Sequence, residues 1–179
     1  MPLFLPDASR QSNPPRACLG RGFTLIELLV AISILAILLL MALPNYTDKI
    51  VRDQITEALA WADVAKKPVA DAWAAKQKLP ADNAAAGLPA ADKLVSNLVS
   101  SVVVEGGALH ITFGNRANGA LKGKVVTLRP AIVLDAPIVP VAWVCGGATP
   151  PDKMTAQGTD KTNVEPGGYL PLACRPPAK

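Results

Sequence analysis

One carboxylate stands inside an apolar stretch near the N-terminus. Across residues 23–43 the only clearly polar side chains are those of Thr24, Glu27 and Ser33. A charged side chain inside a bilayer costs ~2.5–3.5 kcal/mol on insertion scales, so such a group usually has a partner and a function. Glu27 is therefore the first candidate functional residue. The alternative is that its carboxylate simply reaches the headgroup region from the end of a membrane helix.

The other residues that could do chemistry are few and scattered. The single histidine, His110, excludes a histidine-rich metal site and is predicted to be a hydrogen-bonded residue of a strand. The acids of the C-terminal segment are too widely spaced for a calcium loop; they are Asp152, Asp160 and Glu165. The sequence has no phosphate-binding loop, Gly-x-Ser-x-Gly elbow or Cys-x-x-Cys pair. We therefore predict no enzymatic activity, no cofactor and no metal.

Composition sets broader limits. A chain of 179 residues is enough for one compact domain and an appendage. The net charge is +4, and the lysines and arginines are scattered, so charge alone does not predict nucleic-acid binding. The three cysteines are Cys18, Cys145 and Cys174. An odd number leaves a free or removed thiol, and the residues alone leave the pairing open.

The apolar run must position Glu27, and it has the length of a membrane helix. A helix needs about 20 apolar residues to cross the hydrocarbon core of a bilayer, and residues 23–43 are long enough for this. Three arginines and one acid precede the run, and basic flanks stay in the cytoplasm, so the rest of the chain is expected outside it. A secretory signal cut after Ala42 is the alternative interpretation.

Helical spacing of apolar residues continues beyond the run. The repeating positions are Ile50, Val51, Ile55, Ala58, Leu59, Ala62, Val64 and Ala65. We expect one helix from about Thr24 to about Gln77, amphipathic in its second half. Kinks are expected at Pro44 and Pro68, because proline lacks the N–H that the helix needs. Trp61 and Trp73 are expected to pack against the core.

The C-terminal part has the pattern of strands. Four runs are predicted as strands: Leu98–Glu105, Ala108–Phe113, Val125–Arg129 and Val139–Cys145. Gly106-Gly107 between the first two predicts a hairpin, and Pro130 is expected to end the third strand. An antiparallel sheet with one face on the helix gives an α+β fold.

The start of the apolar run resembles a known processing signal. Gly22 followed by Phe23-Thr24-Leu25-Ile26-Glu27 is similar to the prepilin cleavage motif of type IV pilins. The resemblance implies a peptidase that cuts between Gly22 and Phe23 and N-methylates Phe23. It also implies that Glu27 pairs with the terminal amine of a neighbouring subunit during assembly. Pro44 matches a proline of many family members, where the helix can melt within the filament.

The same resemblance implies a disulfide. Removal of the leader takes Cys18 away, and Cys145 and Cys174 then resemble the pair that bounds the C-terminal loop of major pilins. The flanking residues Trp143-Val144 and Tyr169-Leu170-Pro171 look like the flanks in that family. Disulfides persist outside the cytoplasm, and a loop of this size gains roughly 3–4 kcal/mol in the chain-entropy model. Such loops are exposed and often meet surfaces or receptors.

The predicted organisation follows from these features. It comprises a cleaved leader (1–22), a long helix (23–78, with an apolar part 23–44 and an amphipathic part 45–78), a connector (79–97) and a sheet head (98–179) with a disulfide loop (145–174). The resemblance implies the lollipop fold of pilins, with a long N-terminal helix packed against a four-stranded antiparallel sheet.

The expected function is that of a structural subunit of a type IV pilus, made as a single-pass inner-membrane precursor with a cytoplasmic leader and then assembled into an extracellular fimbrium. The expected partners are other pilin subunits, the prepilin peptidase and N-methyltransferase, the inner-membrane assembly platform, a host or surface receptor, and DNA. The pilus would serve adhesion, twitching motility or DNA uptake. Two alternatives remain: a minor pilin or type II secretion pseudopilin, and a membrane-anchored periplasmic binding domain such as a DNA receptor.

Overall fold

The structure is a computed structural model that describes residues 22–165 and 169–177, with residues 42–45 described as backbone only. The chain divides into two units, one ending at Leu40 and one beginning at Met41, and each is described by itself. The predicted leader up to Arg21, with Cys18, lies outside the described residues.

The described part of the first unit is helical and apolar. Helix α1 (Leu25–Trp61) begins in this unit, and residues 22–41 are all exposed. A helix that is apolar on every side needs lipid or other helices around it. Within the described residues, α1 alone is long and apolar enough to cross a membrane, judged by length and composition.

The second unit contains two helices, the C-terminal part of α1 and a separate helix, α2 (Asp63–Lys76). α1 ends at Trp61 and α2 follows after a break at Ala62, so the expectation of one helix to Gln77 is wrong. Pro68 lies inside α2. Because proline cannot donate to the carbonyl four residues earlier, it removes the bond to Val64, and the break lies within the turn just before that residue.

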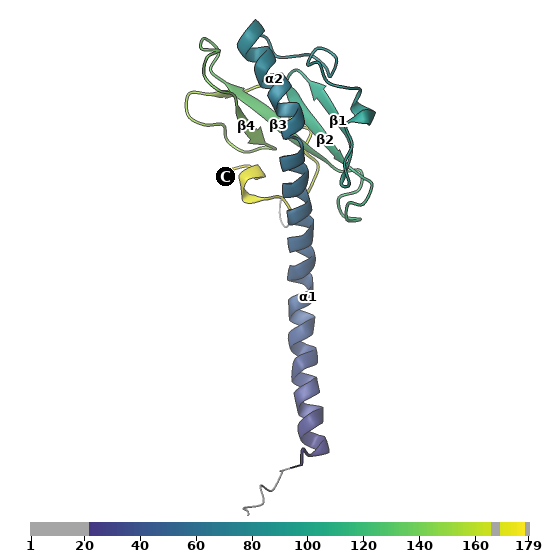
Figure 1. The fold of residues 1–179 in the computed structure, drawn as a ribbon. Helices are drawn as coiled ribbons and strands as arrows, with labels where there is room; N and C mark the ends of the chain where they lie inside the picture. The colour runs from purple at the N-terminus through teal and green to yellow at the C-terminus, as the bar shows by residue number, and fades with distance from the viewer. Residues whose placement is uncertain (1–21, 166–168, 178–179) are drawn as a thin grey trace, which may run out of the picture. The chain divides into compact units, whose positions relative to one another are not determined.

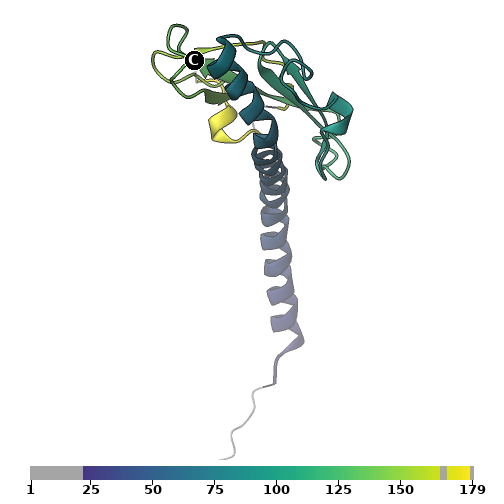
Figure 2. The same ribbon diagram turned by 45° about the horizontal axis from the view of Figure 1, so that its top comes forward.

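The helices of the second unit cover one face of the sheet (Figure 1). A stripe of buried side chains at helical spacing makes the contact: Val51, Ile55, Ala58, Ala62, Ala65, Val69 and Trp73. The same layering is visible with the top of the molecule turned forward (Figure 2). Trp73 is buried and Trp61 packs against the core in a half-buried position, which confirms the expectation that both are packing residues.

The sheet is antiparallel in every pairing that the structure describes. Its strands are β1 (Val99–Glu105), β2 (Ala108–Phe113), β3 (Val125–Ile132), β4 (Ala142–Cys145) and β5 (Thr155–Ala156). Their order is β1-β2-β3-β4, and β5 pairs with β3. The four predicted strands are present, and the predicted hairpin turns on two glycines with positive φ, Gly106 at 57° and Gly107 at 84°.

The strand predictions need three corrections. The fourth strand begins at Ala142 and not at Val139, and the short β5 was not predicted. β3 also continues through Pro130, which pairs with Trp143 of β4. The carbonyl of Pro130 accepts a hydrogen bond from the Gln157 N–H at 2.8 Å, on the side away from β4. Because the N and C=O of one residue point to the same side of an antiparallel strand, the missing N–H interrupts no bond to β4.

Candidate functional site

The first turn of α1 is capped by its own residues. Thr24 Oγ1 accepts a hydrogen bond from the Glu27 backbone N–H at 3.3 Å, and the Thr24 carbonyl accepts one from Leu28 N–H at 3.2 Å. Thr24 therefore occupies the N-cap and Glu27 the third helical position, which is the Thr-x-x-Glu spacing of a capping box. A carboxylate in this first turn is also stabilised by the positive end of the helix dipole.

Among the polar side chains of the apolar segment, that of Glu27 differs from those of Thr24 and Ser33, because its carboxylate forms no hydrogen bond with its own helix. Ser33 Oγ donates to the Leu29 carbonyl at 2.7 Å, and Thr24 is occupied by its capping bond. No hydrogen bond or ion pair of the Glu27 carboxylate lies within the described part of the chain. The carboxylate is exposed and is therefore accessible to groups outside the described residues.

The residues of the predicted cleavage site lie next to this carboxylate. Gly22, Phe23, Thr24 and Glu27 line one open hollow at the start of α1. Gly22 and Phe23 precede the helix, and Phe23 is 76% exposed. The structure thus brings together the residues predicted for cleavage, methylation and assembly. Pro44 lies in the backbone of α1 but its side chain lies outside the described part, so the kink there stays a prediction.

In the second unit a disulfide joins Cys145 at the end of β4 to Cys174. This confirms the predicted pair. The loop that it closes contributes to the core through Val164 and Leu170. It is therefore partly a packed element as well as an exposed surface.

Part of this loop, residues 157–163, crosses β3 and is called the strap below. At its start Gln157 N–H bonds Pro130 on the β2 side of β3. At its end the Asn163 N–H donates to the Val125 carbonyl at 3.1 Å, while Asn163 Oδ1 accepts from the Val125 N–H at 2.6 Å. Since Thr127, two residues along from Val125, accepts from Gly146 next to β4, these Asn163 bonds lie on the β4 side. Between these ends the Lys161 N–H donates to Thr127 Oγ1, and Thr127 faces away from the core that its neighbours Val126 and Leu128 enter. The strap therefore passes over the sheet face opposite the helices.

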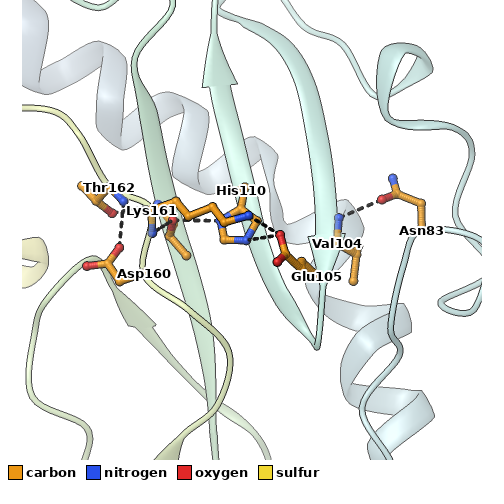
Figure 3. A network of polar contacts seen from close by, with 8 residues as sticks. Asn83, Val104, Glu105, His110, Asp160, Lys161 and Thr162 are labelled. Atoms are coloured by element: carbon orange, nitrogen blue, oxygen red, sulfur yellow. Dashed lines mark hydrogen bonds and ion pairs between the residues drawn. The ribbon is translucent and has the colours of Figure 1, made fainter.

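A polar cluster lies beneath the strap (Figure 3). His110 of β2 and Thr127 of β3 are neighbours in register, and His110 Nδ1 is 3.0 Å from Thr127 Oγ1. His110 Nε2 is 3.6 Å from Glu105 Oε2, and Lys161 Nζ of the strap bonds the same carboxylate oxygen. His110 is 5% exposed and Thr127 is fully buried.

Burial and charge shift two groups of the cluster. Burial lowers the pKa of His110, the nearby Lys161 ammonium lowers it further, and Glu105 and Asp160 act in the opposite direction. The hydrogen bond and charge of Lys161 hold the pKa of Glu105 below its usual value. The threonine–histidine–glutamate order is that of a nucleophile, base and orienting acid, but the buried hydroxyl is closed to any substrate. The cluster is accordingly a structural one.

Sequence reasoning missed the strap and the partners of His110. The prediction of a satisfied strand histidine holds for Nδ1, whereas Nε2 has no hydrogen bond within the described structure. Alternation along β2 could have placed His110 on the outer face, since Leu109 and Ile111 are its core-facing neighbours. No pattern in the glycine- and proline-rich loop indicated that Lys161 would lie over it.

An antiparallel sheet packed on a helix, preceded by an apolar segment able to cross a membrane, defines the class: an α+β protein with an N-terminal membrane-type helix. The family model for pilin, a bacterial filament protein, matches residues 51–175. The model for the prokaryotic N-terminal methylation motif matches residues 20–43. The chain belongs to the pilin family, whose members are structural proteins.

Individual relatives agree with this. The chain is 33% identical to the type IV major pilin protein PilE of Neisseria gonorrhoeae, over 88% of this chain and 95% of that protein. It is 31% identical to a fimbrial protein of Neisseria meningitidis serogroup B, with the same coverage. It is 40% identical to the fimbrial protein EcpC of Eikenella corrodens, over 58% of this chain and 67% of that protein.

Proposed function

We propose that this chain is a polymerising subunit of a type IV pilus, made as a precursor in the inner membrane with its leader in the cytoplasm. A prepilin peptidase cuts between Gly22 and Phe23 and methylates the new terminus. The assembly platform of the inner membrane then adds the subunit to a surface filament of identical copies. Adhesion to a host or surface receptor, twitching motility and DNA uptake are the roles proposed for that filament.

One observation carries the proposal: the apolar first part of α1 holds a carboxylate with no partner in the described structure. Leu28, Ile32 and Leu35 are each about half exposed or more, like the other large apolar side chains up to Met41. A bundle of such helices from many copies would bury these side chains at roughly 25 cal/mol per Å² of apolar surface. It would also bring a positively charged terminus near Glu27.

Cleavage makes that positive charge available. After a cut behind Gly22, the new amine belongs to Phe23, one helical turn from Glu27 along the chain. In a neighbouring copy the same amine can meet the Glu27 carboxylate, and a low-dielectric surrounding strengthens their attraction. The unpaired Glu27 carboxylate thereby favours subunits whose leader has been removed, because these carry the free Phe23 amine.

The test is the intact mass and N-terminal sequence of protein sheared from the cell surface. The proposal predicts abundant chains that begin at methylated Phe23 and lack two hydrogens for the Cys145–Cys174 bond. Chains that begin at Met1, or that are cut after Ala42 and found free in the periplasm, would refute it. A correctly processed chain that is present but rare in the filaments would identify a minor pilin instead.

A further inference from the structure

Lys161 of the strap and His110 of the sheet share both of their polar partners. The backbone N–H of Lys161 donates to Thr127 Oγ1 at 3.0 Å, and His110 Nδ1 lies at the same distance from that oxygen. Lys161 Nζ bonds Glu105 Oε2, and His110 Nε2 faces that oxygen at 3.6 Å. The two groups that anchor Lys161 are thus the same two that the imidazole ring contacts. Figure 3 shows His110 and Lys161 both directed at Glu105.

The hydrogen bonds fit the following arrangement of protons in the neutral state. Thr127 Oγ1 accepts from the Lys161 N–H, so its own hydroxyl proton is free to donate to His110 Nδ1. Neutral imidazole then carries its proton on Nε2, toward the Glu105 carboxylate. In this tautomer every polar atom of the contact is compatible with the strap in place.

A second proton on the ring reverses this compatibility. Nδ1 becomes a donor, so the buried Thr127 hydroxyl proton loses its acceptor, and both lone pairs of Oγ1 are taken up by the ring N–H and the Lys161 N–H. At the other end the charged ring competes with Lys161 Nζ for one carboxylate oxygen. The charged groups that act on His110 within the described structure are Glu105, Lys161 and Asp160. The first and third attract the charged ring, and the ammonium repels it.

We propose that His110 is a pH-sensitive latch: when its ring takes up a second proton, the charge buried beside the Lys161 ammonium and the unpaired Thr127 hydroxyl weaken both anchors of Lys161, and the strap, residues 157–163, leaves the outer face of the sheet. The charged ring gains solvent by this movement, because the strap is what covers it on that face. The disulfide keeps both ends of the larger loop in place, so the opening is local. The outer face of β2 and β3 is then accessible only in acid.

Titration of the full-length chain in detergent micelles tests the latch. The chain has one histidine, so a ring labelled with carbon-13 gives a signal that needs no assignment. Labelling lysine amides with nitrogen-15 reports the strap, and the Lys161 signal is identified by its loss in Lys161→Met. Because opening is coupled to the uptake of one proton, protection of the Lys161 amide from hydrogen exchange, corrected for intrinsic rates, should fall about tenfold per pH unit as the pH drops from about 6.5, the ordinary pKa of an exposed histidine, toward the lower His110 midpoint, and should level off below it.

Three variants separate a latch from a merely buried ring. In His110→Gln, which cannot take up the proton, Lys161 protection should not change over the range in which the wild-type ring titrates. Glu105→Gln removes an attraction and should lower the His110 midpoint, whereas Lys161→Met removes a repulsion and should raise it. These midpoint shifts keep the test informative even if His110→Gln folds poorly.

Several results would overturn the proposal. Lys161 amide protection that stays constant while His110 titrates would show that the strap does not respond to the ring. Equal loss of protection in wild type and His110→Gln would assign the opening to another group. A ring that stays neutral throughout the acid range in which the chain remains folded would mean that the latch never opens.

Discussion

The side chain of Asn83 completes the exposed edge of β1 at Val104. Asn83 Oδ1 accepts from the Val104 N–H at 2.7 Å, and Asn83 Nδ2 donates to the Val102 carbonyl at 3.0 Å. The same amide also donates to the Pro89 carbonyl at 3.1 Å. One carboxamide from the connector thus takes the place that a further strand would occupy (Figure 3). An edge strand with free N–H and C=O groups is a template for unwanted pairing.

Asn83→Ala should therefore destabilise the head and expose this edge. The loss of three hydrogen bonds leaves half-buried backbone groups unpaired, at roughly 1–3 kcal/mol for a group that stays buried. Denaturant unfolding measures the change, and light scattering on incubation measures association through the edge. Asn97→Ala, at an exposed asparagine whose side chain makes no hydrogen bond with the described residues, is the matched control. Equal stability of the two variants would contradict this role of Asn83.

Loss of the disulfide should weaken the second unit without abolishing its sheet. Cys145 and Cys174 are separated by 29 residues, and closing a loop of this size contributes roughly 3–4 kcal/mol in the chain-entropy model. The double variant Cys145→Ala/Cys174→Ala should lose this amount in denaturant unfolding, and the strap should exchange its amides faster than β2. Uniform faster exchange in strap and sheet would contradict a local effect.

Gly158 is a position at which the strap lies close to β2. Its φ is +80°, and an added Cβ would lie 2.6 Å from the Ala108 Cβ. Gly158→Ala should therefore cost about 1–3 kcal/mol and loosen the strap. Gly119→Ala, where an added Cβ meets nothing within 4 Å, should be neutral or slightly stabilising. Thermal unfolding of the two variants side by side is the measurement.

Stability should fall in two stages on acidification. The folded-state pKa of His110 is lowered, so its contribution is complete above the unfolded-state value near 6.5 and is lost as the pH falls below it. The pKa of Glu105 is also lowered, so its contribution is lost as the pH falls below about 4.5. Free energies of unfolding from pH 8 to 3 should show both stages. His110→Gln should abolish only the first, and Lys161→Met should reduce the second.

Glu27→Ala should prevent efficient filament assembly while leaving cleavage intact. The substitution removes the unpaired carboxylate of the apolar segment and keeps the Thr24 cap, because the bond to Thr24 comes from the backbone of residue 27. Surface filaments and the N-terminal sequence of the membrane fraction are the measurements. Ser33→Ala, which removes only a bond to the Leu29 carbonyl, is the control and should assemble normally. Wild-type filament yield in Glu27→Ala would contradict the assembly role.

Much of the fold could be predicted because its signals are local. The apolar run, the two-glycine turn and the valine-rich strands each depend on residues a few positions apart. Pro130 misled the prediction, because a proline in a strand is tolerated when its nitrogen faces away from the neighbouring strand, and that direction depends on the register. The position of the helix break at Ala62 likewise depends on tertiary packing, and it cannot be predicted from the positions of the prolines alone.

The two candidate sites also differ in how far the sequence alone predicts them. The contiguous residues from Gly22 to Glu27 could be identified from their order alone, and their roles in processing and assembly stay predictions. The contact of Lys161 with Glu105 joins positions 56 residues apart, and no periodicity spans such a distance. The strap is held over His110 by tertiary contacts. These are the pairing of β5 with β3 and the hydrogen bonds to Thr127 and Val125.

The strap also divides the disulfide loop into two stretches that differ in their tolerance of change. Pro151, Asp152 and Lys153 form an exposed tip outside the sheet, before β5 begins. A foreign peptide inserted at this tip would be displayed to solvent while every anchor of the strap stayed in place. In a filament that left this tip uncovered, such a graft would be repeated once per subunit, as a regular array of epitopes.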